Sequence, residues 1–313
     1  MTLLQIISCF LLGHKRSSLR DWSREFPEVD YALLTAFFQQ HFDVQKLLWL
    51  AAGQLFNLQS GYFILDEIVI ERSKTGTHAD VKFRYKSAGG YVIPAFSIVL
   101  LLWTDGLVRI PIRFELRQPG DGSHVDAALR LLSWARNQWG QKPQCVLFDS
   151  GFCSERMLKR ITAYGWAFIC RIPKTRKFDG KQLWRYKQQG YWNEVGFLAC
   201  GVKVKAIRRK DKFFICNRLS WDANEIVETY RKRHAIEETF RILKGHCHWK
   251  GCQLRTHERV ERFLGLGALA LMVWELNRLQ LPGLLTIYEL RRNAILRLFT
   301  PQIPDLDSLL LAS

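Results

Sequence analysis

The spacing of hydrophobic residues changes near residue 60, and this change separates a helical segment from an α/β segment. Before it, Leu and Phe recur at helical intervals through 31–38 and 44–50, which predicts helices. After Gly61 the apolar runs are rich in β-branched and aromatic residues, which predicts strands. We therefore expect a helical N-terminal module over 1–57, followed by a mixed region of strands and helices.

The order of elements in the α/β region indicates its fold. Three strands are followed by a helix, a strand, a helix and a strand, with predicted ranges 62–71, 92–103, 107–116, 123–139, 145–149, 154–164 and 166–172. The first three strands can pair in antiparallel fashion, whereas strands separated by helices should pair in parallel. This order predicts an α/β fold with a ribonuclease-H-like mixed sheet flanked by helices.

The segment 174–215 interrupts this order and is strongly basic. Its Lys and Arg residues are interleaved with aromatic residues, including Trp184 and Trp192, and its short alternating runs predict strands. This mixture is typical of a groove that holds phosphates and stacks bases. We interpret the segment as a small β insertion that contacts DNA. The alternative is a solvated hairpin whose aromatic residues pack on the core.

The last part of the chain is predicted to be helical. A long helix begins at Asp222 as its N-cap, and further helices are predicted over 258–279 and 287–299. The chain then divides into four parts: the N-terminal module (1–57), a core in two segments (58–173 and 216–250), the insertion (174–215) and the C-terminal helices (251–313). Two roles stay open for the N-terminal module: DNA contact, or a helical cap on the next domain.

The chain carries a large excess of positive charge. Its 313 residues include 46 Lys and Arg against 29 Asp and Glu, which gives a formal charge of +17 and a pI of about 9.7. Such an excess favours a polyanionic partner, most commonly nucleic acid, over an enzyme that merely happens to be basic.

Cysteine usage and the apolar runs bear on location. The eight cysteines form no regular framework, which favours buried thiols in a reducing compartment, and the His and Cys residues of 246–252 lack a second half for a zinc site. Bases follow the apolar start at 1–12 instead of preceding it, and the apolar run 264–274 is too short for a bilayer. We expect a cytoplasmic protein, nucleoid-associated when bound to DNA, with no membrane partner.

One helical stripe carries the clearest chemistry. Arg233, Glu237 and Lys244 follow Tyr230 at offsets of three, seven and fourteen residues. At about 100° per residue, all four side chains fall within roughly 60° of the helix surface. A carboxylate between two cations and a phenol is the arrangement needed to hold a metal ion and grip phosphates beside it.

Two further acids, Asp66 and Asp149, lie within or at the end of apolar strands, where a lone carboxylate is costly. Strand cleavage by two Mg²⁺ ions about 4 Å apart needs such acids to converge from separate elements. Glu67 should face away from Asp66, and Glu238 is turned by about 100° from Glu237. We therefore predict that Asp66, Asp149 and Glu237 meet in one site.

These residues resemble the signature of a known family. Tyr230, Arg233, Glu237 and Lys244 have the spacing of the Tyr–Arg–Glu–Lys signature of DDE transposases of the insertion-sequence-four type. The segments 65–67, 149–152 and 253–255, the last with Arg259, resemble the two aspartate motifs and the basic segment of that family. The resemblance covers about 60–275, and it departs from many relatives at Glu67, where they have a second Asp.

The resemblance implies an activity and assigns roles to residues. Asp66, Asp149 and Glu237 would bind two Mg²⁺ ions, with Mn²⁺ as a substitute. DNA would be contacted by Tyr230, Arg233, Lys244 and Arg255, and Trp184 or Trp192 would stabilise a base flipped out during hairpin formation.

Enzymes of this group cut double-stranded DNA at the terminal inverted repeats of a mobile element. They often pass through a hairpin, and they join the 3′-hydroxyl ends to target DNA as homodimers in a synaptic complex. The alternatives are a domesticated relative that binds DNA without strand transfer and a structure-selective DNA nuclease. The presence of all three acids favours an active enzyme.

Overall fold

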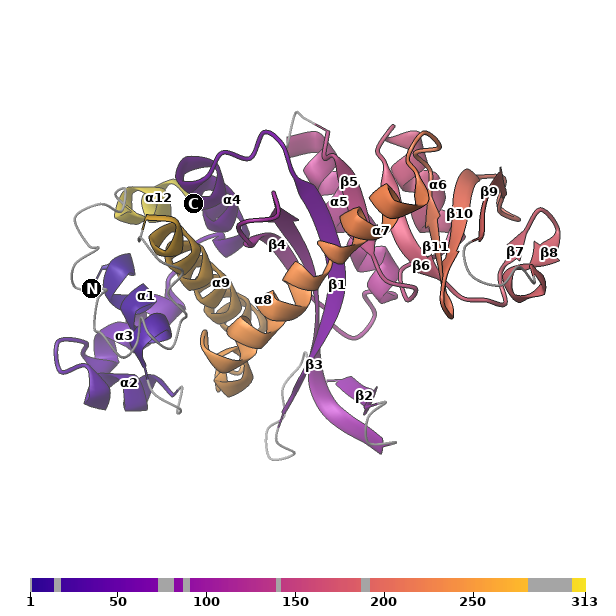
Figure 1. Ribbon diagram of the computed structural model, residues 1–313. Helices are drawn as coiled ribbons and strands as arrows, with labels where there is room; N and C mark the ends of the chain where they lie inside the picture. The colour runs from indigo at the N-terminus through magenta and orange to yellow at the C-terminus, as the bar shows by residue number, and fades with distance from the viewer. Residues whose placement is uncertain are drawn as a thin grey trace.

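A long twisted sheet runs through the protein, and helices pack on both of its faces (Figure 1). The computed structural model describes residues 2–13, 18–72, 82–86, 91–138, 142–186, 192–280 and 306–313. Within these residues the sheet has nine strands in the order β2-β3-β1-β5-β6-β11-β10-β9, with β4 paired to β3.

The central strands establish the mixed sheet that the sequence predicts. The first five are β1 (Tyr62–Glu71), β2 (Lys82–Lys86), β3 (Tyr91–Thr104), β4 (Ile110–Leu116) and β5 (Cys145–Phe148). Strand β1 pairs antiparallel with β3 and parallel with β5, which in turn pairs parallel with β6 (Phe168–Ile172). All four residues of β5 are buried, as expected for a parallel strand covered on both faces. The predicted α/β fold class is confirmed.

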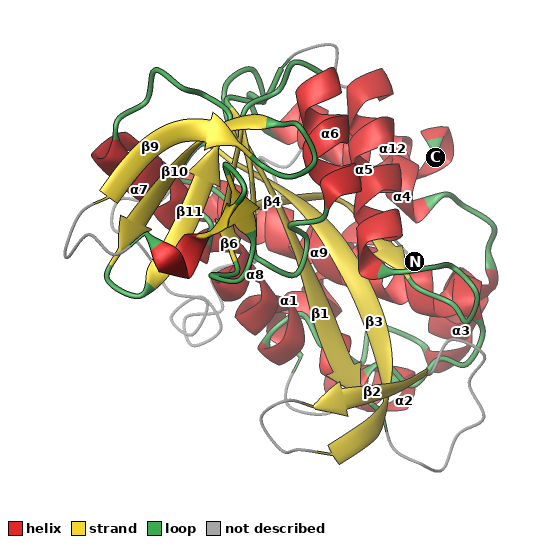
Figure 2. Ribbon diagram, turned by 90° about the vertical axis from the view of Figure 1, so that its right-hand side faces the viewer, coloured by secondary structure: helices red, strands yellow, loops and turns green. Residues whose placement is uncertain are grey.

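The segment predicted as an insertion, 174–215, extends the main sheet. Its longer strands are β9 (Trp192–Phe197), β10 (Lys203–Arg209) and β11 (Lys212–Cys216). Strand β11 pairs antiparallel with β6, so these strands continue the core sheet to one end of the molecule (Figure 2). The short strands β7 (Lys177–Phe178) and β8 (Lys181–Gln182) form a separate hairpin. The domain boundaries themselves stay a prediction.

Helices cover the two faces of the sheet. Helices α5 (His124–Gln138) and α6 (Glu155–Ala163) connect the core strands, and α7 (Ala223–Arg231) and α8 (His234–Gly245) cross in front of β1 in Figure 1. The long helix predicted from Asp222 is thus two helices, which corrects the prediction. Around Lys232 and Arg233 the hydrogen bonds become three-residue bonds, such as Arg233 N–H to Tyr230 O (2.9 Å), and they tighten the chain into a turn.

The N-terminal helices share one hydrophobic core with the sheet domain. They are α1 (Leu3–Leu12), α2 (Leu19–Glu25), α3 (Tyr31–Gln39) and α4 (Val44–Leu55). Helices α1, α3 and α4 pack on α9 (His257–Gln280), α1 and α4 also on α12 (Leu306–Ala312), α4 also on β4, and α2 on α3. A side chain at Gly265 of α9 would collide with Val44 of α4, so glycine permits their close approach. This packing favours the cap role for the N-terminal module. The helix predicted over 287–299 lies outside the described residues.

Two further features concern cysteines and membranes. The eight cysteines are free thiols, and all but Cys200 are buried. None of the helices in the described ranges is both long and apolar enough to cross a membrane.

Candidate active site

Two aspartates lie at the same level on neighbouring parallel strands. Leu65 of β1 pairs in register with Phe148 of β5, so Asp66 and Asp149 each follow a paired position. Because residues in register on adjacent strands share a face, the two carboxylates extend to the same side of the sheet. The side chain of Asp66 is only 16% exposed, so its carboxylate sits in a largely desolvated place.

The loop after β5 holds the Asp149 carboxylate. The N–H of Gly151 donates to Asp149 Oδ1 (2.8 Å), and a side chain at Gly151 would lie 3.1 Å from the same oxygen. Phe152 is buried and anchors the loop, with the ring of His124 packed edge-on at 4.8 Å. His124 Nε2 also lies 2.9 Å from the Gly151 carbonyl oxygen. Backbone and packing together therefore fix this carboxylate.

Arg233, at the start of α8, joins the third acid, Glu237, to Asp66. Arg233 Nη2 donates to Asp66 Oδ2 (2.5 Å), and its Nη1 donates to Glu237 Oε1 (2.7 Å). Glu237 Oε2 lies 3.0 Å from Nδ1 of His234, one turn earlier on the same helix. A single guanidinium thus bridges carboxylates from β1 and α8, as its planar fork allows.

Electrostatic effects link all three acids to this guanidinium. Burial raises the pKa of Asp66 to about 6; Arg233 opposes the rise, while the charges of Asp149 and Glu237 add to it. Burial lowers the pKa of Arg233, but the nearby charges of Asp66, Tyr230 and Asp149 more than offset it, so that the net pKa is raised. The structure therefore brings Asp66, Asp149 and Glu237 into one electrostatic neighbourhood.

The donor atoms suit a hard divalent cation, because carboxylate oxygens are the ligands that Mg²⁺ prefers. Among the described residues, no three Asp, Glu, His or Cys side chains lie close enough to enclose one ion. Asp66 and Asp149 would be the nearest ligands. Glu237, whose side chain is 52% exposed, would have to leave Arg233 and His234 to join them. The assignment of two Mg²⁺ ions stays a prediction.

Comparison with known families decides the class of protein. The family described as "Transposase DDE domain" matches residues 62–273, which is more than half of the chain. The chain belongs to this family. The match confirms the DDE transposase part of the predicted resemblance, while the insertion-sequence-four type stays a prediction.

One solved transposase structure is similar in fold to this chain. The chain is similar to the piggyBac transposase in a synaptic complex with hairpin DNA, with a TM-score of 0.54, 9% identity, and coverage of 99% of this chain and 73% of that one. A strand transfer complex of the Drosophila P element transposase gives a TM-score of 0.28, 10% identity, and coverage of 97% and 88%. At such identities the piggyBac likeness concerns the fold, and it supports the ribonuclease-H-like sheet. No curated protein matches the chain.

The remaining members of the helical stripe lie at different distances from the acids of this transposase. Tyr230 lies in the last turn of α7, with its ring edge-on to Phe214 at 5.0 Å, and its buried hydroxyl has no hydrogen-bond partner among the described residues. Its pKa is raised strongly by burial, and Arg233 opposes the rise. Lys244 lies two turns beyond Glu237, about 10 Å at 1.5 Å per residue. The turn between the two helices divides the predicted stripe, because Tyr230 lies on α7 whereas Glu237 and Lys244 lie on α8; the prediction of one continuous stripe is corrected.

The two other predicted DNA contacts, Lys244 and Arg255, differ in exposure. Arg255 is exposed in the loop that precedes α9, whereas Lys244 is half-buried. Burial lowers the pKa of Lys244, and the charge of Lys250 lowers it further. The role of Lys244 and Arg255 as DNA contacts stays a prediction.

The two tryptophans proposed to stack on DNA bases have different environments. Trp184 is 48% exposed and is flanked by Arg185, whose guanidinium carbon lies 5.2 Å from the ring centroid. Trp192 is only 2% exposed and packs against Phe178 and Tyr186, with centroids 5.6 and 4.7 Å away. The assignment of Trp192 as a stacking residue is therefore wrong for this conformation, because its faces are covered by the core.

Arg171 lies beside the acids although sequence reasoning did not select it. It is exposed on β6 and is in register with Phe214, whose ring packs on Tyr230. Its charge lowers the pKa of Tyr230, which places it near that hydroxyl. A lone arginine inside an otherwise buried strand was the available signal, because such a charge needs a functional or structural reason.

A second network lies behind the acids, on the opposite face of β1. Glu67 accepts a hydrogen bond from Arg117 Nη1 (2.9 Å) and another from the hydroxyl of Ser97, and its Oε2 lies 3.9 Å from His124 Nδ1. Arg117 is almost fully buried and also donates to the Gly122 carbonyl oxygen (2.5 Å). This network joins β1, β3 and the start of α5, so it holds the strand of Asp66 against the helix that contacts the Asp149 loop.

Proposed function

We propose that this transposase cleaves double-stranded DNA at the terminal inverted repeats of a mobile element and transfers the 3′-hydroxyl ends to target DNA. The observation that supports this best is the placement of Asp66 and Asp149 at matched positions on paired strands, with Arg233 joining Asp66 to Glu237. The three acids are proposed to hold two divalent ions, Mg²⁺ or Mn²⁺. Such ions, when bound, activate the attacking oxygen and stabilise the leaving oxygen.

The surrounding residues are proposed to position DNA. Arg233, freed from the carboxylates, would hold the phosphate next to the cleaved bond, because a guanidinium matches phosphate geometry. Tyr230 would orient the strand end with its hydroxyl, while Lys244 and Arg255 would contact phosphates further along α8. Arg171 has the charge and the exposure to join them.

Double-stranded DNA is the proposed partner, both as element end and as target. The formal charge of +17 supports a polyanionic ligand, and the similar piggyBac transposase was solved as a synaptic complex with hairpin DNA. We extend the proposal to two copies of the chain in a synaptic complex and to a cytoplasmic location, nucleoid-associated when DNA is bound.

The test is cleavage and joining by the pure full-length protein. Duplexes that carry the inverted repeats flanking its coding region are incubated with Mg²⁺ or Mn²⁺ and a supercoiled target, and all strands are resolved by size. We expect nicks at the repeat ends, hairpins and joined products. Binding without any cleavage would favour the domesticated relative, and cleavage of branched DNA without joining would favour the nuclease.

Metal binding should weaken as pH falls through about 6. Asp66 must be ionised to bind a cation, and its pKa of about 6 means that protons compete below that value. We expect the affinity for Mn²⁺ to fall by up to about tenfold per pH unit below pH 6 and to level off above it. Calorimetric titration at pH 5, 6 and 7 measures this. Asp66→Asn protein is the control, and the same affinity at pH 5 and 7 in the unaltered protein would contradict the role of Asp66.

Removing the exposed indole should affect one step of the reaction more than the others. We expect Trp184→Ala to slow hairpin formation roughly tenfold while first-strand nicking stays near its original rate, because stacking on one base contributes about 1–3 kcal/mol. Rates of nicking and hairpin formation are measured separately on end-labelled duplexes. Equal slowing of both steps would count against a stacking role.

A further inference from the structure

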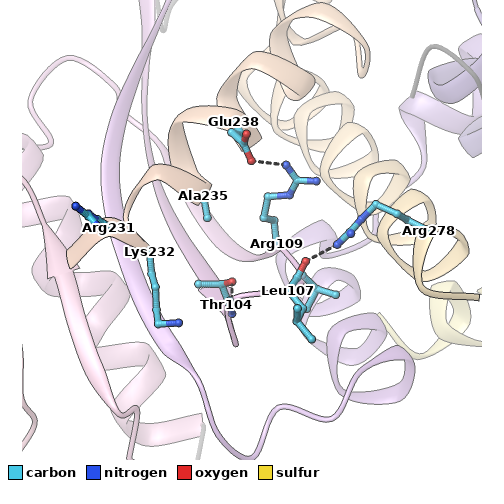
Figure 3. Close-up of a pocket in the computed structure, with 10 residues that line it drawn as sticks. Thr104, Leu107, Arg109, Arg231, Lys232, Ala235, Glu238 and Arg278 are labelled. Atoms are coloured by element: carbon cyan, nitrogen blue, oxygen red, sulfur yellow. Dashed lines mark hydrogen bonds and ion pairs between the residues drawn. The ribbon is translucent and has the colours of Figure 1, made fainter. Parts of the chain in front are cut away.

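A basic pocket lies beside the α7–α8 turn (Figure 3). It has a volume of about 290 Å³, and its walls are the end of β3, the turn into β4, the start of α8 and one arginine of α9. Thr104, Leu107, Arg109, Lys232, Ala235 and Arg278 are among the residues that line it. The volume is at the lower limit of ligand pockets, which suits a single phosphodiester group better than a bulky ligand.

Two of its arginines are held rigidly by carboxylates. Arg109 donates to Glu275 Oε1 (2.6 Å) and to Glu238 Oε2 (2.8 Å), and Arg278 donates to Glu275 Oε2 (2.7 Å) and to the Leu107 carbonyl oxygen. Glu275 is fully buried, so the three side chains form a fixed wall. Most of the positive charge on this wall is matched by the two carboxylates.

Lys232 supplies the charge that is not matched. Among the described residues, no carboxylate forms an ion pair with it. Its Nζ instead lies 5.1 Å from the centroid of the Tyr62 ring and 3.0 Å from the position that a side chain at Gly106 would take. Arg231, beside it, is already paired with Glu228 (2.6 Å). The pocket therefore presents one free ammonium group against a rigid polar wall.

The position of the pocket relates it to the acids. Thr104, at its edge, pairs with Tyr62, and Asp66 is four residues further along β1. At about 3.3 Å per residue the separation is about 13 Å, which equals about four nucleotides at a rise of 3.4 Å. Lys232 and Arg233 are consecutive, and their side chains reach the pocket and the acids respectively.

We propose that this pocket binds one backbone phosphate of DNA about four nucleotides from the cleaved bond, with Lys232 as its main ligand. This proposal rests on the proposed function. A phosphate held there would fix the turn from which Arg233 extends, and so would align the reacting strand with Asp66.

The first test is the salt dependence of DNA binding. The affinity of the full-length protein for a fluorescent 30-base-pair duplex of mixed sequence is measured by anisotropy between about 50 and 200 mM salt. Lys232→Gln should reduce the slope of log affinity against log salt by about 1, and Lys232→Arg should restore it. Lys159→Gln, on the exposed side of α6, is the matched control and should keep the original slope.

The second test fills the pocket without changing any charge. Ala235→Leu adds bulk at the pocket wall and keeps the helical propensity of α8. Ala235→Leu should reduce the slope of log affinity against log salt as Lys232→Gln does. If its slope equals that of the unaltered protein, Lys232 acts outside the pocket and the proposal is overturned. If neither variant changes the slope and the protein still cleaves DNA, the proposal of a phosphate site in the pocket fails while the proposed function stands. If the unaltered protein does not bind the duplex, the proposed function is overturned as well.

Discussion

Replacing Asp149 with asparagine should abolish metal-dependent DNA cleavage without unfolding the protein. The substitution keeps the Oδ1 atom that accepts from the Gly151 N–H, so the loop after β5 should keep its shape. It removes the negative charge that faces Asp66 and Arg233. Loss of one metal ligand removes several kcal/mol of transition-state stabilisation, so we expect a rate at least about 10³-fold lower.

The rate of nicking at the element end, followed on a labelled duplex with Mg²⁺ in excess, measures this loss. Asp211→Asn is the matched control, because Asp211 is exposed in the β10–β11 turn and should tolerate the same change. DNA affinity in Asp149→Asn protein should stay the same or rise, since a negative charge near the phosphates is lost. Cleavage at the original rate would remove Asp149 from the proposed metal site and would end the two-metal proposal.

The meeting of the two aspartates could be predicted from the sequence because it depends on local pattern and one general rule. Strands separated by helices pair in parallel, so an acid within one strand and an acid at the end of its neighbour can lie side by side on one face of the sheet. Asp66 and Asp149 follow Leu65 and Phe148, which the structure places in register. The addition of Glu237 needed only helical geometry, since Arg233 lies one turn before it.

The features that could not be predicted from the sequence are contacts between segments that are distant along the chain. The turn between α7 and α8 contains neither Gly nor Pro, so no residue marked it. Strands β11 and β6 pair in antiparallel fashion although they are about 45 residues apart along the chain. Local periodicity predicts strands but not which distant strands pair. That pairing also brings charged and aromatic residues of 174–215 into the main sheet, where some of them become core.

The buried tryptophan of this segment, Trp192, gives the second large effect. Trp192→Ala should lower the free energy of unfolding by about 3–5 kcal/mol, because it removes a large side chain from the contact of β9 with Phe178, Tyr186 and Phe213. Trp184→Ala should change it by no more than about 0.5 kcal/mol, because that indole is half exposed. The pair is a natural comparison, since both residues lie in the same basic segment.

Urea unfolding followed by circular dichroism measures the difference as a lower midpoint for Trp192→Ala. Phe178 is fully buried against Trp192, and Tyr186 donates its hydroxyl to the Phe178 carbonyl oxygen (2.8 Å). Loss of Trp192 should therefore also loosen the β7–β8 hairpin, and with it the place of Trp184. Nicking and hairpin formation should then decline together in Trp192→Ala, unlike the selective effect of Trp184→Ala. Equal midpoints for the two variants would show that Trp192 does not support the fold, and base stacking by Trp192 would have to be considered again.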